Sequence, residues 1–238
     1  MSKSQRYSAL VLWDVDHTLV SISGVSRAIY EKAFESTIGY PLDRLASMAG
    51  RTENAIIVET LELNGVEVSP ATVSRFYSAL RLAARQLEDR MKESGQALSG
   101  AAEAISALRN RRVVQSLVTG NIKPIARAKL DAFALSRGID FEVGGYGDDG
   151  SDRAILVQLA RERAEKRYAA PFPGRRAFVI GDTPHDIKGA HDAGAFAIGV
   201  ATGSSSAQAL EKCGADLVLP DLMNVEALCS AILDASPR

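Results

Sequence analysis

The sequence predicts an α/β fold in which helices cover both faces of a parallel sheet and a helical domain is inserted after the first strand. Through most of the chain, short apolar runs alternate with amphipathic helical stretches. This alternation is typical of parallel sheets covered by helices on both faces. Residues 21–94, by contrast, show only helical patterns. That stretch is too long for an ordinary connection, so it indicates a second domain.

The predicted strands are short continuous apolar runs, which fit strands that are buried on both faces of a sheet. The first covers residues 9–13, reads Ala-Leu-Val-Leu-Trp and ends directly before Asp14. The other strands are predicted at residues 113–118, 177–180, 195–200 and 216–219, with residues 141–143 as a weak sixth candidate.

Helices are predicted where apolar residues recur at a spacing of three or four. In the α/β part these stretches are residues 100–109, 124–135, 153–167, 186–193, 205–212 and 224–235. In the inserted part they are residues 26–38, 53–64 and 71–92. We therefore expect a core domain of residues 1–20 and 96–238 and an all-helical cap domain of residues 21–95. Ligands bind beyond the carboxyl ends of strands in such sheets, so the insertion is a candidate lid.

The composition limits the classes of function. The chain has 28 basic and 29 acidic residues and a net charge of −1, which argues against a broad nucleic-acid surface. No apolar stretch of about 20 residues is present, so we expect no membrane partner. Cys213 and Cys229 are the only cysteines and do not form a disulfide framework. The simplest location is therefore the reducing cytoplasm, and the sequence does not indicate an oligomeric state.

Polar residues follow three of the predicted strands, at the point where each strand ends. They are the segments 14–18, 119–121 and 181–186, which read D-V-D-H-T, T-G-N and G-D-T-P-H-D. Such residues are ordinary turn and cap formers when they occur singly. Because all three segments should lie at one edge of one sheet, together they indicate a functional site.

Four carboxylates in these segments would repel one another without a compensating charge. They belong to Asp14, Asp16, Asp182 and Asp186. Mg²⁺ binds carboxylates and keeps positions open for water and phosphate oxygens. Thr119 offers a hydroxyl group and nearby backbone amides to a phosphate. The segments therefore predict a Mg²⁺ site that acts on a phosphoryl group.

The pair of carboxylates in the first segment suggests a division of labour. A tight turn after the strand would let Asp14 and Asp16 approach the same phosphorus atom. One carboxylate can then attack in line and form an aspartyl phosphate. The other can protonate the leaving alkoxide and later activate water.

These segments resemble the motifs of the haloacid dehalogenase superfamily, and within it the phosphoglycolate phosphatase-like phosphatases. Residues 14–18 resemble the first motif, D-x-D-x-T. Residues 117–121, L-V-T-G-N, resemble the second motif, and residues 180–186, I-G-D-T-P-H-D, resemble the fourth, G-D-x-x-x-D. The resemblance covers nearly the whole chain. It implies a Rossmann-like core sheet in the order 5-4-1-2-3 and an inserted α-helical cap of the C1 type.

The resemblance also implies roles for the four aspartates. Asp14 would be the nucleophile and Asp16 the general acid and base. Asp14, the backbone carbonyl of Asp16 and the carboxylate of Asp182 would bind Mg²⁺, with support from Asp186.

Substrate-binding residues are expected in both domains. By resemblance Thr119 would hold the phosphate, with Gly120 and Asn121 beside it. In the cap, Arg51 lies just before a predicted helix, where similar caps carry a substrate-specificity loop. Arg51 would contact a polar or anionic leaving group, or else it is a solvated residue at a helix start.

The chain departs from the family pattern at two positions. His17 stands where the family usually has glycine, and it is either tolerated there or contacts the leaving group. The third motif usually supplies a lysine at the start of the helix before the fourth motif. Arg153 is the cation at that place, although arginine and lysine differ in shape. Lys123 is the reserve candidate and Lys129 is a further alternative for this role, although both are expected nearer the second motif's surface.

The sequence therefore predicts a Mg²⁺-dependent phosphatase for a small phosphorylated metabolite. Three other functions are considered. A phosphomutase with a similar cap would use the same motifs. A 2-haloacid dehalogenase would need neither a metal nor a second aspartate as acid. A catalytically weak relative would bind phosphate or a partner protein. The sequence does not identify the substrate.

Overall fold

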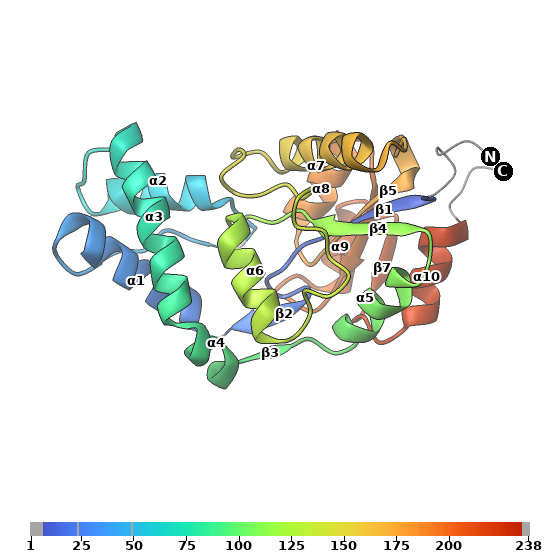
Figure 1. Cartoon of the computed structure of the whole chain (residues 1–238), viewed down its shortest axis with the longest axis horizontal. Helices are drawn as coiled ribbons and strands as arrows, with labels where there is room; N and C mark the ends of the chain where they lie inside the picture. Colours follow the sequence, from blue (N-terminus) through green and yellow to red (C-terminus); the bar gives the residue numbers. More distant parts are fainter. Residues whose placement is uncertain (1–6, 23, 49, 235–238) are drawn as a thin grey trace.

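The computed structural model describes residues 7–22, 24–48 and 50–234 and has an α/β core at one end and a helical cap at the other (Figure 1). The core sheet has five strands, and every neighbouring pair is parallel. In spatial order they are β4 (Val113–Leu117), β1 (Ala9–Trp13), β5 (Ala177–Gly181), β6 (Phe196–Val200) and β7 (Leu217–Leu219). The predicted fold class is confirmed.

The sheet differs from the expected one at one edge. Residues 141–143 form turns, so their prediction as a strand is wrong. A single parallel bridge between Val118 and Gly145 stands in their place beside β4. The run is too short to pair along a strand, and the Tyr146 hydroxyl donates a hydrogen bond back to the carbonyl of Phe141 at 2.7 Å. The four remaining strands expected in the core keep the predicted order, and β7 extends the opposite edge.

Successive residues of β1 point to opposite faces of the sheet, because the side-chain period of a strand is two. Val11 and Trp13 lie in one hydrophobic cluster, and Leu10 and Leu12 lie in another. The first cluster includes residues of α5 (Ala101–Arg109), α6 (Lys123–Ala132) and α10 (Val225–Asp234). The second includes residues of α7 (Arg153–Tyr168), α8 (Pro184–Asp192) and α9 (Ala207–Lys212). A short 3-10 helix, η2 (Gly174–Arg176), directly precedes β5.

The cap has a hydrophobic cluster of its own, built around residues such as Phe34 and Phe76. Its helices are α1 (Val25–Ile38), α2 (Glu53–Leu63), α3 (Pro70–Gln86) and α4 (Glu88–Ser94). The prediction of one helix over residues 71–92 is wrong, because the helix breaks at Leu87, whose ψ is 14°. Ile122 and Ile125 at the start of α6 join the cap cluster and connect it to the core.

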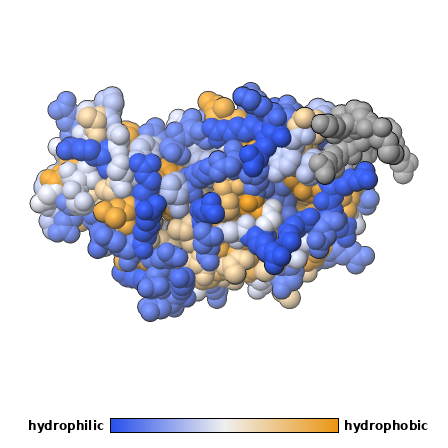
Figure 2. Space-filling view, viewed as in Figure 1, coloured by the Kyte–Doolittle hydropathy of each residue, from blue (hydrophilic) through white to orange (hydrophobic). Residues whose placement is uncertain are grey.

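Two short strands connect the cap to the core. β2 (Val20–Ile22) and β3 (Gly95–Ala97) pair antiparallel. The expectation of a purely helical insertion is therefore wrong at its two ends. Hydrophilic residues cover most of the face that Figure 2 shows. Within the described part of the chain, no helix is both long and apolar enough to cross a membrane.

Candidate active site

The three predicted polar segments meet at one place, beyond the carboxyl ends of β1, β4 and β5. A cavity of about 780 Å³ opens there, between the core and the cap. Its wall includes the core residues Asp14, Asp16, His17, Thr119, Gly120, Asn121, Lys129, Arg153 and Asp182, and the cap residues Arg51 and Glu53. The residues of the three predicted segments thus line one cavity together with Lys129, an alternative candidate for the third-motif cation, and with Glu53, which had no predicted role.

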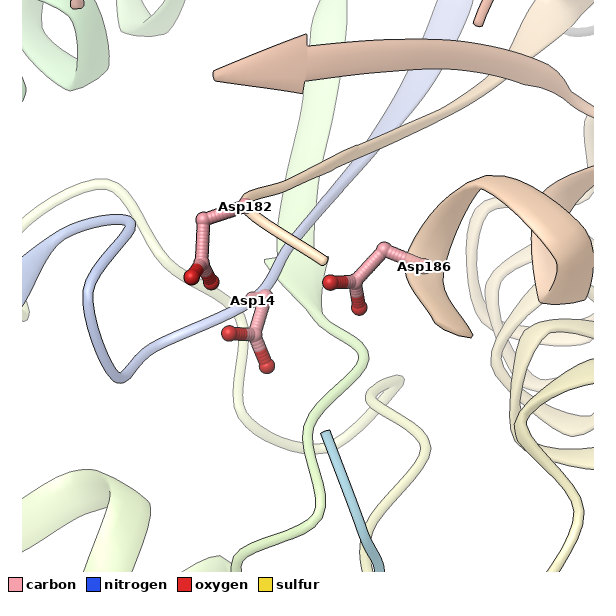
Figure 3. A group of neighbouring side chains, drawn as sticks. All are labelled: Asp14, Asp182 and Asp186. Carbon is pink, nitrogen blue, oxygen red and sulfur yellow. The ribbon is translucent and has the colours of Figure 1, made fainter. Parts of the chain in front are cut away.

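Three buried aspartates form a cluster at the bottom of this site (Figure 3). One carboxylate oxygen each of Asp14, Asp182 and Asp186 lies within 4.8 Å of the other two. Asp14 follows β1 directly, and its backbone N–H donates to the carbonyl of Ile180 at 2.8 Å. Asp182 follows β5, and the Thr18 hydroxyl donates to its carboxylate at 3.3 Å.

The start of α8 orients Asp186. Its Oδ2 atom accepts hydrogen bonds from the backbone N–H and hydroxyl of Thr183, at 3.0 and 2.6 Å, in a capping box. Its Oδ1 atom is buried and has no hydrogen-bond partner. A Cβ atom at Gly181 would lie 2.3 Å from the carboxyl carbon of Asp186, so only glycine leaves room for this arrangement.

The electrostatics of the cluster call for a cation. Burial, followed by the charge of Asp186, raises the pKa of Asp14 well above its ordinary value, and Arg153 only partly opposes the rise. The same two causes raise the pKa of Asp182 to about 7. Unpaired buried carboxylates are costly, and oxygen ligands are the ones that hard divalent cations prefer. The three aspartates, with an Oδ1 atom of Asp186 that accepts no hydrogen bond, therefore fit a divalent metal ion.

Arg153 lies against two of these aspartates. Its Nη1 atom is 3.2 Å from Oδ1 of Asp14, and its Nη2 atom is 3.3 Å from Oδ1 of Asp186. A Cβ atom at Gly189 would lie 2.5 Å from Cγ of Arg153, so the absence of a side chain at Gly189 lets the Arg153 side chain pack closely against α8. Lys123, the reserve candidate, instead pairs with Glu142 at 2.7 Å. The structure brings Arg153 to the carboxylates and leaves Lys123 outside the cavity wall.

Lys129 is buried in the site, and the expectation of a surface lysine is wrong. Its Nζ atom lies 2.7 Å from both carboxylate oxygens of Asp16 and 2.7 Å from Oδ1 of Asn121. Burial alone would raise the pKa of Asp16, but the charge and hydrogen bonds of Lys129 outweigh it and lower the pKa. The Asp16 carboxylate thus faces Lys129 and is not one of the three clustered carboxylates. A metal contact through its backbone carbonyl stays a prediction.

The segment after β4 offers the hydroxyl proton of Thr119 to a ligand, and the backbone of the cap packs closely against its Gly120. The Thr119 hydroxyl oxygen accepts hydrogen bonds from the backbone and side-chain nitrogens of Asn121, at 3.3 and 2.9 Å, so its own proton is available to a ligand. The carbonyl of Gly120 accepts a hydrogen bond from the backbone N–H of Glu53 at 2.7 Å. A Cβ atom at Gly120 would lie 1.9 Å from the carbonyl oxygen of Arg51, so this position requires glycine.

The cap contributes charged residues to the cavity wall, among them Arg51 and Glu53. The guanidinium group of Arg51 donates to the carbonyls of Ser47 and Ala55, at 3.2 and 3.3 Å, and forms an ion pair with Glu59. Glu53 is buried, and burial raises its pKa above the ordinary value. Its position in the first turn of α2 was the only sequence signal for it.

His17 adopts a left-handed backbone conformation with φ of 60°. Glycine is the residue that reaches this conformation at least cost, which explains a glycine preference at this place in the first motif. Histidine enters it more readily than branched residues do. The Thr202 hydroxyl donates to the carbonyl of His17 at 2.5 Å and holds the turn.

Comparison with known proteins decides the family. The family described as haloacid dehalogenase-like hydrolase matches residues 11–191. The chain belongs to this family. It is 28% identical to a phosphoglycolate phosphatase of Caulobacter vibrioides, over 96% of this chain and 94% of the relative.

Solved structures share the fold of the whole chain. A hydrolase of Pseudomonas syringae superposes with a TM-score of 0.65 at 21% identity and covers 94% of this chain and 99% of its own. A putative beta-phosphoglucomutase of Bacteroides vulgatus superposes with a TM-score of 0.64 at 15% identity and covers 98% and 92%. These likenesses establish a common fold.

Proposed function

We propose that this protein hydrolyses the monophosphate esters of small metabolites with the help of Mg²⁺, through an aspartyl phosphate on Asp14. The chain is a phosphatase of its family, and the proposal adds the metal, the substrate class and the residue roles. The observation that carries it is the buried cluster of Asp14, Asp182 and Asp186 with Arg153 beside it, at a cavity that the cap helps to line. The Caulobacter relative, described as a phosphoglycolate phosphatase, supports a small phosphorylated substrate.

In the proposed first step, a carboxylate oxygen of Asp14 attacks the phosphorus atom and the bond from phosphorus to the ester oxygen breaks. Asp16 donates a proton to the departing alkoxide, which leaves as an alcohol. The Thr119 hydroxyl and the guanidinium group of Arg153 hold the phosphoryl oxygens, because both offer donors at the edge where negative charge develops.

In the second step, Asp16 removes a proton from a water molecule that attacks the phosphorus atom of the aspartyl phosphate. The bond between phosphorus and Asp14 breaks, inorganic phosphate leaves, and Asp14 returns as a carboxylate. The cap supports this sequence because its residues form part of the cavity wall, where they limit the access of bulk water.

The metal would be held by the carboxylates of Asp14, Asp182 and Asp186 and by the backbone carbonyl of Asp16. Bound Mg²⁺ would neutralise charge on the phosphoryl group and favour the ionised form of Asp14. In the cap, Arg51 is the proposed contact to a polar leaving group, and Gly120 and Asn121 are proposed to shape the phosphate loop with Thr119.

The cap is proposed to be a separate domain of residues 21–95, with residues 1–20 and 96–238 as the core. The separate hydrophobic cluster of the cap supports this division. A location in the reducing cytoplasm is proposed as well, and the free thiols of Cys213 and Cys229 support it.

A dehalogenase is disfavoured, because such an enzyme has no use for the clustered acids Asp182 and Asp186. A phosphomutase would also form an aspartyl phosphate but would return the phosphoryl group to a sugar, so product analysis separates the two. A catalytically weak relative would bind phosphate without releasing it from esters.

The test is phosphate release from p-nitrophenyl phosphate and a panel of small phosphorylated metabolites, with Mg²⁺, with EDTA and with Asp14→Asn. We expect release that requires the metal and falls by at least about 10³-fold in the variant. Release that survives in Asp14→Asn would overturn the proposed mechanism. Folded protein that binds phosphate but releases none would favour the weak relative.

A further inference from the structure

Glu53 is the carboxylate that the cap contributes to the cavity wall. Only 3% of the residue is exposed, although it lines the same cavity as Asp14. Its backbone N–H donates to the carbonyl of Gly120 at 2.7 Å, which places it beside the proposed phosphate loop. A leaving group that extends from the phosphate toward the cap therefore meets Glu53 early.

The carboxylate of Glu53 is fixed in place and still has acceptor capacity. The Tyr30 hydroxyl donates to its Oε1 atom at 2.5 Å, and the backbone N–H of Ile122 donates to its Oε2 atom at 3.4 Å. A carboxylate offers about four acceptor sites, so these two donors leave room for another. The carboxylate is thus held by two neighbours in a residue that lines the cavity, and it retains acceptor sites that these neighbours do not use.

Glu53 also has no ion-pair partner among the described residues, whereas the two cap arginines in the same cavity wall each have one. Arg51 is paired with Glu59, and Arg27 is paired with Glu31 at 2.8 Å. Among the ion pairs formed by the described residues, none includes Glu53. The cap side of the cavity therefore holds one carboxylate that forms no ion pair with the described residues.

We infer that Glu53 determines substrate specificity by favouring leaving groups that carry a hydroxyl or amino donor and disfavouring those that carry a second anionic group. This inference rests on the proposed phosphatase function of the same site. A fixed buried carboxylate gains a charge-assisted hydrogen bond from a donor and repels an anion at the same distance. The apolar residues Ile22, Met48 and Ile56 line the same cavity and leave room for a carbon skeleton around that donor.

The test uses substrates that differ only at the end of the leaving group. 2-Hydroxyethyl phosphate and phosphoglycolate carry a hydroxymethyl group and a carboxylate at the same position. 3-Hydroxypropyl phosphate and 3-phosphonooxypropanoate repeat the pair with one more carbon. The longer pair covers the case in which the shorter leaving groups do not extend as far as Glu53. We expect the hydroxyl member of at least one pair to have a kcat/KM about tenfold higher in the wild type.

Glu53→Gln keeps the shape and removes the charge, and we expect it to bring that ratio to within about threefold, mainly through KM. Glu62→Gln, an exposed position on the same helix, is the matched control and should keep the wild-type ratio. If Glu53→Gln slows all substrates by the same factor, the residue has only a structural role and the inference is wrong. The wild-type ratios decide by themselves if Glu53→Gln does not fold.

A binding measurement separates this inference from the proposed function. 2-Hydroxyethylphosphonate and phosphonoacetate have no ester bond to hydrolyse and differ in the same way as the substrates. Calorimetry with Mg²⁺ should show tighter binding of the hydroxyl compound by the wild type, and loss of that preference in Glu53→Gln. This result without turnover of any ester would reject the phosphatase and keep the inference. A wild type that prefers phosphonoacetate, or binds neither compound, would overturn the inference.

Discussion

The core side and the cap side of the cavity are built from different chemistry. On the core side, Asp14, Asp182 and Asp186 crowd together against Arg153, and their charges remain unbalanced without a cation. On the cap side, the wall is partly apolar and its arginines are paired, with Glu53 as the unpaired exception. This difference supports our proposal that phosphoryl chemistry takes place at the core edge and that the cap selects the leaving group.

The largest effect on this comparison should come from Arg153. Arg153→Met removes the cation nearest to Asp14 and Asp186, so we expect kcat to fall by at least about 100-fold. Lys123→Met is the matched control, because its partner Glu142 lies outside the cavity wall, and it should change kcat by less than about twofold. Steady-state kinetics on p-nitrophenyl phosphate measures both. Equal losses in the two variants would show that the core edge has no privileged cation.

Lys129 should have the next largest effect. Lys129→Met leaves the carboxylate of Asp16 without its ion-pair partner, and we expect the free energy of unfolding to fall by about 2 kcal/mol. Because Lys129 lowers the pKa of Asp16, its removal should raise that pKa. The descending limb of the pH profile of kcat/KM for an alkyl phosphate should therefore move to higher pH. An unmoved limb would contradict the role of Asp16 as general acid.

The stability of the metal-free protein should depend on pH through Asp182. Its pKa of about 7 in the fold lies above the ordinary value of 3.8, so the folded state binds a proton more tightly than the unfolded state. This stabilisation is present below about pH 4 and is lost as the pH rises towards 7. A metal ion competes with that proton. Mg²⁺ should therefore raise the melting temperature more at pH 8 than at pH 5, whereas equal shifts would place the metal elsewhere.

The smallest effect is expected at His17. His17→Gly relieves a left-handed backbone conformation but also adds conformational freedom to the unfolded chain. The two contributions oppose each other, so the free energy of unfolding should change by less than about 1 kcal/mol. We expect kcat/KM to stay within about threefold, as measured on p-nitrophenyl phosphate. A large loss of activity would instead assign the imidazole a contact with the leaving group.

The core was more predictable from the sequence than the cap side of the site. Apolar strands of five residues and the carboxylates that follow them are local signals in the sequence. These signals are enough to predict the sheet and to expect Asp14, Asp182 and Asp186 at one of its edges. β2 and β3 have three residues each and exist because they pair with one another, which no local pattern shows.

The missed residues depend on tertiary contacts. Lys129 fits the polar face of a helix in the sequence, and only the approach of Asp16 and Asn121 makes it a buried partner. Glu53 is an ordinary acid in the first turn of a helix until the cap closes over Gly120. The sequence has no glycine or proline at Leu87 that would predict the break between α3 and α4.

Covalent catalysis by Asp14, with Asp16 as acid and base, is tested most sharply by a rapid-quench experiment on Asp16→Asn. The p-nitrophenolate leaving group is a stable anion that needs no proton, so the first step should survive while the second loses its base. With Mg²⁺, we expect a burst of one p-nitrophenolate per active site, and mass spectrometry should find one phosphoryl group on the peptide that contains Asp14. Turnover without a burst or a phosphorylated peptide, or a phosphoryl group on another residue, would contradict this mechanism.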